Sequence, residues 1–176
     1  MKRLSFVFLA AAAALVLTTP LAAQQAPAPA AAPPAPADPP APFYPHIVAS
    51  GLRGGYQVVA TDVNKDGKVD LIGLGAQMNE LLWYENPYWT PHVITRDARR
   101  MINMAAADTD RDGIPEIALA YEFSTNPAQS PGTLAILKSG KDPRAPWTLK
   151  EIDAIPTSHR VRAATIDGQA AFINAP

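Results

Sequence analysis

Two segments of the chain space their oxygen-bearing side chains in the same way. Residues 62–70 and residues 108–116 both read D-x-[DN]-x-D-G-x-x-[DE] and are followed by apolar residues. Oxygen side chains at every second position, with glycine at the sixth, let a short loop curl around one hard cation. Two copies at matching places in a longer repeat are hard to explain without calcium, so both loops are predicted to bind Ca²⁺.

The repeat extends well beyond these loops. The segment Phe43–Val48 matches Trp89–Ile94, and both match Trp147–Ile152 more loosely. Val48 and Ile94 each stand fourteen residues before the first Asp of the loop that follows. The first two copies are therefore 46 residues apart, and the second and third are about 58 apart. Periods near this length, built only from short strands, are typical of propeller blades.

The first 23 residues have the pattern of a secretory signal peptide. Lys2 and Arg3 give a positive start, Leu4–Leu17 form an apolar run, and Leu21–Ala23 offer small residues for cleavage. A membrane anchor is the alternative, but the apolar run is short for a span. We therefore expect a secreted or periplasmic protein that keeps no stable membrane span after cleavage.

Composition separates the rest of the chain into two parts. Residues 24–42 are almost entirely Ala, Pro and Gln, which predicts a disordered, semi-rigid spacer. Residues 43–176 are enough for one folded core, and the absence of cysteine means that no disulfide can stabilise it. The net charge is −1 and no basic stripe is present, so nucleic acid is not an expected partner.

Alternating hydrophobicity and β-branched residues predict strands throughout residues 43–176, with Pro and Gly clustered between them and no sustained helix. The opening strand is His46–Ala49. The strands that follow are Tyr56–Thr61, Asp70–Leu74, Glu80–Glu85, His92–Thr95, Ile102–Ala107, Glu116–Tyr121, Thr133–Lys138, Thr148–Ile152, Arg160–Thr165 and Ala171–Ile173.

These loops and their flanking strands resemble the FG-GAP, or VCBS, repeat family over roughly residues 43–176. The resemblance implies an all-β fold, a β-propeller with cations in the loops that join the first two strands of each blade. On this interpretation the chain holds the last strand of one blade, two four-stranded blades and half of another. We expect about two and a half blades, hence an incomplete propeller that is the N-terminal part of a longer protein or a truncated product.

The resemblance also implies which residues hold calcium. Each loop would supply four side chains and one backbone carbonyl. The implied ligands are Asp62, Asn64, Asp66, Asp70 and the carbonyl of Lys68 in the first loop, and Asp108, Asp110, Asp112, Glu116 and the carbonyl of Ile114 in the second.

The loops allow two other interpretations. An EF-hand needs a Glu at position twelve and flanking helices, whereas position twelve is Gly73 in one loop and Leu119 in the other. Acidic turns without a metal are the second alternative. The third repeat unit keeps only Asp167 and Gly168 of the motif, so we expect a turn there that has lost the metal.

Two function classes stay open. The first is an exported binding or scaffold module with structural calcium and a carbohydrate or protein ligand. The second is the N-terminal fragment of a propeller enzyme of the lyase type that acts on carbohydrate, since some similar propellers are lyases. The sequence identifies no catalytic residue, because it contains no nucleophile elbow, phosphate loop or zinc signature.

Some side chains outside the loops also carry expectations. The segment Ser158–Arg162, with His159, Arg160 and Arg162, opens the strand expected to line a central channel. There it would bind anionic or polyol ligands, or form only a solvated strand end. The three tryptophans are interpreted as core between blades rather than as sugar platforms; they are Trp83, Trp89 and Trp147.

Overall fold

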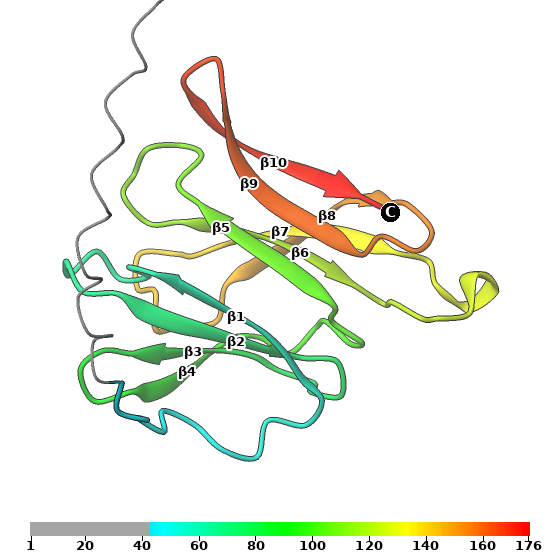
Figure 1. Ribbon diagram of the computed structural model, residues 1–176. Coiled ribbons are helices and arrows are strands. Elements are labelled where there is room, and N and C mark those ends of the chain that lie inside the picture. The colour runs from blue at the N-terminus through cyan, green and yellow to red at the C-terminus, as the bar shows by residue number, and fades with distance from the viewer. Residues whose placement is uncertain (1–42) are drawn as a thin grey trace, which may run out of the picture. The chain divides into compact units, whose positions relative to one another are not determined.

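The computed structural model describes residues 43–176, so the predicted signal peptide (1–23) and spacer (24–42) lie outside the described residues. The described part contains ten strands and one short 3₁₀ turn, Pro127–Gln129 (Figure 1). The predicted all-β class is therefore confirmed. Within residues 43–176 no helix has the length and apolar character needed to cross a bilayer.

The strands form two four-stranded sheets and a hairpin, in which all neighbouring strands are antiparallel. Every strand predicted from Tyr56 onward is confirmed, with ends that differ by two residues or fewer. The first sheet contains β1 (Gly55–Thr61), β2 (Asp70–Gly75), β3 (Leu81–Glu85) and β4 (Thr90–Thr95); the second contains β5 (Asn103–Ala107), β6 (Glu116–Tyr121), β7 (Thr133–Lys138) and β8 (Thr148–Ala154); the hairpin contains β9 (Arg160–Ile166) and β10 (Gln169–Ala175).

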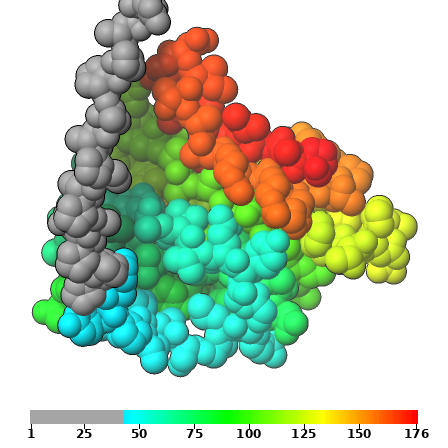
Figure 2. Space-filling view, in the orientation of Figure 1, coloured from blue at the N-terminus to red at the C-terminus, as the bar shows by residue number. Residues whose placement is uncertain are grey.

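The first strand of each unit lies next to the first strand of the following unit. β1 contacts β5, and β5 contacts β9, so these three strands run side by side through the molecule (Figure 1). In the space-filling view the atoms of the β9–β10 hairpin, coloured orange to red, lie at the surface on one side (Figure 2). Two complete sheets followed by a two-stranded unit agree with the blade arrangement expected for the repeat.

The second sheet is buried on both faces, as its middle strand shows. In β6, Ile117 and Leu119 join the core shared with the first sheet, whereas Ala118 and Ala120 join a second core that includes Val161 of β9. A strand with apolar residues at every position is what a sheet covered on both faces requires. Alternate residues of β6 therefore pack against the first unit and the third unit.

The tryptophans do not share one environment. Trp83 of β3 is fully buried and its ring lies 4.7 Å from the ring of His92, and Trp147 is 5% exposed in the same core. Trp89 instead lies half-buried in the turn between β3 and β4 with a φ of 57°. The interpretation of Trp89 as core is therefore wrong, because this residue lies in a turn and joins neither buried core.

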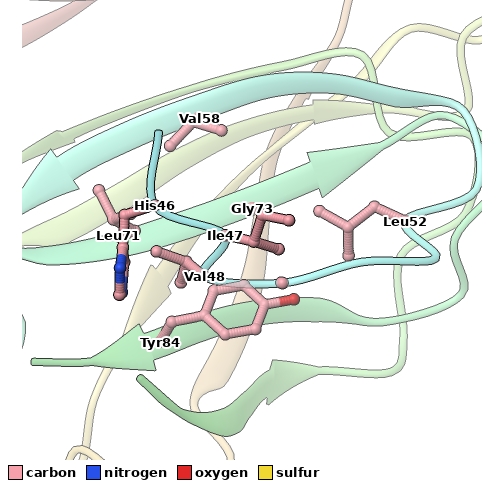
Figure 3. Close-up of a pocket in the computed structure, with 9 residues that line it drawn as sticks. His46, Ile47, Val48, Leu52, Val58, Leu71, Gly73 and Tyr84 are labelled. Carbon is pink, nitrogen blue, oxygen red and sulfur yellow. The ribbon is translucent and has the colours of Figure 1, made fainter. Parts of the chain in front are cut away.

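The predicted opening strand, His46–Ala49, is also wrong. These residues have no strand partner and instead pass over the outer face of the first sheet, above Leu71, Gly73 and Tyr84 (Figure 3). An apolar groove of about 400 Å³ separates the segment from that face. Alternating apolar residues become a strand only where a neighbouring strand can pair with their backbone, and none lies beside this segment among the described residues.

Side-chain amides join the first strands of successive units. Gln57 of β1 accepts the Met104 amide at 2.7 Å and donates to the Met104 carbonyl at 2.9 Å. One repeat later, Asn103 of β5 accepts the buried Val161 amide at 2.7 Å and a proton of Arg162 at 3.0 Å. Because Asn103 stands 46 residues after Gln57, this side-chain contact is part of the repeat and links each unit to the next.

The substitution Asn103→Ala is predicted to lower the free energy of unfolding by about 1–3 kcal/mol, because it leaves the buried Val161 amide without its acceptor. Chemical denaturation with a fluorescence readout measures the change. The exposed Asn79 provides the matched control, and Asn79→Ala should unfold like the parent protein. Equal stability of Asn103→Ala and the parent would show that the amide does not hold the units together.

Candidate metal centres

The first loop, residues 62–70, folds around its own side-chain oxygens. The amide of Asp66 donates to Asp62 Oδ1 and to Asn64 Oδ1, both at 3.1 Å. The Gly67 amide donates to Asp62 Oδ2 at 2.8 Å, and the Lys68 amide donates to Asp66 Oδ1 at 2.9 Å. These bonds to backbone amides direct the three side chains toward the inside of one tight loop.

The second loop, residues 108–116, repeats these bonds. The Asp112 amide donates to Asp108 Oδ1 at 3.1 Å and to Asp110 Oδ1 at 3.2 Å. The Gly113 amide donates to Asp108 Oδ2 at 2.9 Å, and the Ile114 amide donates to Asp112 Oδ1 at 2.8 Å. Each atom corresponds to one 46 residues earlier, so the two loops share a backbone as well as a motif.

A buried carboxylate ends each loop at the first residue of the second strand. Asp70 is fully buried and accepts the Val63 amide at 2.9 Å and the Asn86 amide at 2.8 Å. Glu116, which is 4% exposed, accepts the Thr109 amide at 2.8 Å and the Thr109 hydroxyl at 2.5 Å. In both loops the side chain of the last residue therefore accepts the backbone amide of the second residue.

Three of the predicted side-chain ligands of the second loop come together, whereas among the described residues the carboxylates of the first loop form no group as close. In the second loop, Asp108, Asp110 and Glu116 each offer a carboxylate oxygen, and these oxygens lie within 4.8 Å of one another. Oxygen donors in a loop of this size fit Ca²⁺, which takes six to eight oxygen ligands. The carbonyl oxygens of Lys68 and Ile114 stay predictions.

Sequence reasoning missed two residues that contact the loops, Glu85 and Lys138, which end the third strands of the two sheets. The Lys138 ammonium donates to Asp110, to Glu116 Oε1 at 2.7 Å and to Asp112 Oδ2 at 3.4 Å. Glu85 accepts a proton of the Asn64 amide group at 2.9 Å. Strand pairing identifies the two positions as equivalent, because Tyr84 pairs with Leu71 and Leu137 pairs with Ile117.

Glu85 is itself in contact with Arg144 and His92. Arg144, from the connection between β7 and β8, donates to both Glu85 oxygens, and His92 lies 2.8 Å from Glu85 Oε2. The hydrogen bonds from Arg144 and His92 keep the pKa of the Glu85 carboxyl below its ordinary value. Glu85 thus holds the amide group of Asn64, so that Asn64 Oδ1 faces the loop.

The two buried carboxylates experience opposite electrostatic environments. Burial raises the pKa of Asp70 above its ordinary value despite the bonds from Asn86 and Val63, and the charges of Asp66 and Asp62 raise it further. Burial also opposes ionisation of Glu116, but the hydrogen bonds from Lys138 and Thr109 outweigh it and lower the pKa. The interior of the first loop therefore lacks the positive charge that Lys138 brings to the second.

The third unit replaces the whole loop with a two-residue turn. Ile166 pairs with Gln169, and Asp167 and Gly168 between them have φ values of 50° and 75°. Positive φ at both central residues is the geometry of a tight hairpin turn, which favours Asp-Gly. The expected turn is therefore confirmed, and the unit presents one carboxylate where the other units present four oxygen-bearing side chains.

The segment Ser158–Arg162 lies at the interfaces between units. His159 packs against the ring of Phe123 at 5.0 Å, and its Nε2 lies 3.3 Å from the Tyr56 hydroxyl. Ser158 is fully buried and donates to Asn174 at 2.7 Å. Together with the bond from Arg162 to Asn103, these contacts give the segment a packing role.

Gly67→Ala and Gly113→Ala are each predicted to lower the free energy of unfolding by about 1–2 kcal/mol, because both glycines have φ near 85°. Denaturation in the presence of a chelator measures the effect without bound metal; at Gly113 the added Cβ would also meet the Lys65 side chain at 2.5 Å, whereas at Gly67 it would meet nothing. Gly140 is exposed, has no positive φ and has open space at its Cβ position, so Gly140→Ala should be neutral or slightly stabilising. Equal effects at all three positions would contradict the turn geometry.

Comparison with known proteins agrees with this geometry. Residues 46–119 match the model of the FG-GAP-like repeat, a stretch that contains the first sheet, both loops and the start of the second sheet. No curated protein matches the chain. The resemblance to the FG-GAP, or VCBS, repeat family stated from the sequence is thus confirmed over residues 46–119.

Proposed function

We propose that this chain is part of an exported calcium-binding β-propeller that acts as a binding or scaffold module, with a structural Ca²⁺ in the loop of each complete blade. The observation that carries the proposal is the repetition of one carboxylate cage at the same corner of two successive four-stranded sheets. The third unit reverses the chain at this corner with a two-residue turn, Asp167–Gly168, so the longer loops are not needed merely to make the turn.

The calcium ion would act on stability and not on a reaction. Asp62, Asn64, Asp66 and Asp70 would hold it in the first loop, and their equivalents would hold it in the second. When bound, the ion supplies positive charge to carboxylates that otherwise repel one another. It would also tie the first strand of each sheet to the second, because the loop residues lie between these strands.

The propeller architecture is supported by the outer face of the first sheet. Val58 on this face is 62% exposed, and the 46–49 segment covers the face only across the groove in Figure 3. The equivalent face of the second sheet is buried against the first. The groove residues Val58, Leu71, Gly73 and Tyr84 correspond to the buried Met104, Ile117, Leu119 and Leu137. A further blade is therefore the proposed neighbour of this face.

Calcium is predicted to raise the melting temperature of the protein relative to a chelator. A ligand that binds only the folded state stabilises it by about 2.7 kcal/mol per site at a concentration one hundred times Kd. Kd values of about 10⁻⁴–10⁻³ M are common for extracellular modules, so calcium at about 10–100 mM is needed to reach this excess. Identical melts of well-folded protein with calcium and with chelator would refute the proposal.

Isothermal titration of single-site variants assigns the sites. Asp66→Ala should abolish binding at the first loop only, and Asp112→Ala should abolish binding at the second loop only. Asp167→Ala provides the control in the third unit and should leave the stoichiometry unchanged. A stoichiometry of three in the parent protein would show that the third unit binds metal after all.

Self-association through the outer face of the first sheet is the expected behaviour of the isolated chain, because an uncovered blade face and unpaired strand edges favour contact with another copy. Light scattering against concentration measures it. Val58→Lys should reduce the association, whereas Tyr88→Lys, at a residue that is 88% exposed in the β3–β4 turn, should not. A monodisperse, cooperatively melting parent monomer at high concentration would contradict the incomplete-propeller proposal.

A further inference from the structure

The two loops carry different charges at two equivalent positions that contact each other. The second oxygen donor of the first loop is the neutral Asn64, and the end of the third strand beside it is Glu85. In the second loop the same two positions hold Asp110 and Lys138. The backbones are the same, and this pair changes the charge next to the second oxygen donor of each loop.

Lys138 reaches the centre of the carboxylate cluster of the second loop. Its ammonium contacts Asp110, Asp112 and Glu116, which are three of the four side chains proposed to hold the ion. Glu116 is almost fully buried, so the ammonium enters the loop and does not merely cover its rim. A divalent cation coordinated by the same oxygens would repel this ammonium at close range.

The first loop has a much weaker internal cation. The Lys68 ammonium contacts one carboxylate of that loop, Asp66 at 3.1 Å, and 51% of the Lys68 side chain is exposed. Exposed pairs of this kind contribute little, since solvent screens them. The neighbouring Arg144 contacts Glu85 outside the loop and leaves the buried Asp70 without a cationic partner among its hydrogen bonds.

We infer that Lys138 is a built-in competitor for the metal ion at the second loop, so that this loop binds calcium more weakly than the first and is already closed by the ammonium when calcium is scarce. This inference rests on the proposed function. The lysine side chain is 46% exposed on a flexible four-carbon stem, so it has a path into solvent when an ion enters. The first blade would then depend on calcium for loop closure, and the second blade would not.

The substitution Lys138→Met tests the competition, because methionine keeps an unbranched side chain and offers no ammonium or oxygen. Titration in the Asp66→Ala background reports the second loop alone. Lys138→Met should tighten its calcium affinity by about tenfold or more, since one charge-assisted hydrogen bond alone corresponds to about that factor. In chelator the same substitution should destabilise the folded protein, because three carboxylates lose their cation.

Two variants control for net charge and for side-chain size. Lys141→Met removes one positive charge from the exposed turn after β7 and should leave the affinity of the second loop and the stability in chelator unchanged. Lys138→Arg keeps a cation at the site and should keep calcium binding weak. Unchanged or weaker binding in Lys138→Met would overturn the inference.

The unsubstituted full chain gives a second readout that does not depend on a variant that folds. Amine acetylation followed by peptide mass spectrometry measures the reactivity of each lysine with and without calcium. Calcium should increase the reactivity of Lys138, because an entering ion displaces it from three carboxylates, and should leave Lys141 unchanged. Unchanged or reduced reactivity of Lys138 at calcium concentrations that saturate the second loop would overturn the inference.

The outcomes separate this inference from the proposed function. Calcium binding at the first loop, measured in the Asp112→Ala background, together with no effect of Lys138→Met at the second loop would overturn the inference alone. No calcium binding at either loop in any variant would overturn the proposed function and the inference with it. A second loop that binds calcium only after Lys138→Met would support both.

Discussion

The organisation of each complete unit depends on one buried carboxylate at the start of its second strand. Asp70 and Glu116 accept the amide of the second loop residue, so the end of each loop is tied to its beginning. A carboxylate buried in this way is stable only with such donors around it, and these donors hold the loop in one conformation. The strands on both sides then start in register, and the other oxygens of the loop meet on its inner side.

This local constraint also connects successive units. Because the loops occupy the same corner of neighbouring sheets, Lys65 of the first loop reaches the second loop and donates to the Asp112 carbonyl at 2.6 Å. At the other end of the first strands, the amides of Gln57 and Asn103 make the bonds that join each unit to the next. The buried faces of β6 fill the space between these two sets of polar contacts.

The two loops share one backbone conformation but differ in the charges inside them. The pKa of the buried acid is raised in the first loop and lowered in the second, and the first-loop interior contains no counterpart of Lys138. In the proposed structural role, an ion would neutralise the loop carboxylates, which an ammonium also does, so such a change would be tolerated. The proposed difference in calcium dependence between the blades follows from this substitution of one cation for another.

The sequence by itself determined the all-β class, the ten strands of the described residues and the position of both loops, because alternation, glycine placement and motif spacing are local properties. It also placed the turn at Asp167–Gly168. It could not decide the state of His46–Ala49 or the burial of Trp89, which depend on whether a partner strand or sheet covers them. Only the tertiary structure brought Glu85 and Lys138 to the loops. The connection between the second and third strands is longer in the second sheet, so these residues fall out of the 46-residue period and are related by strand pairing alone.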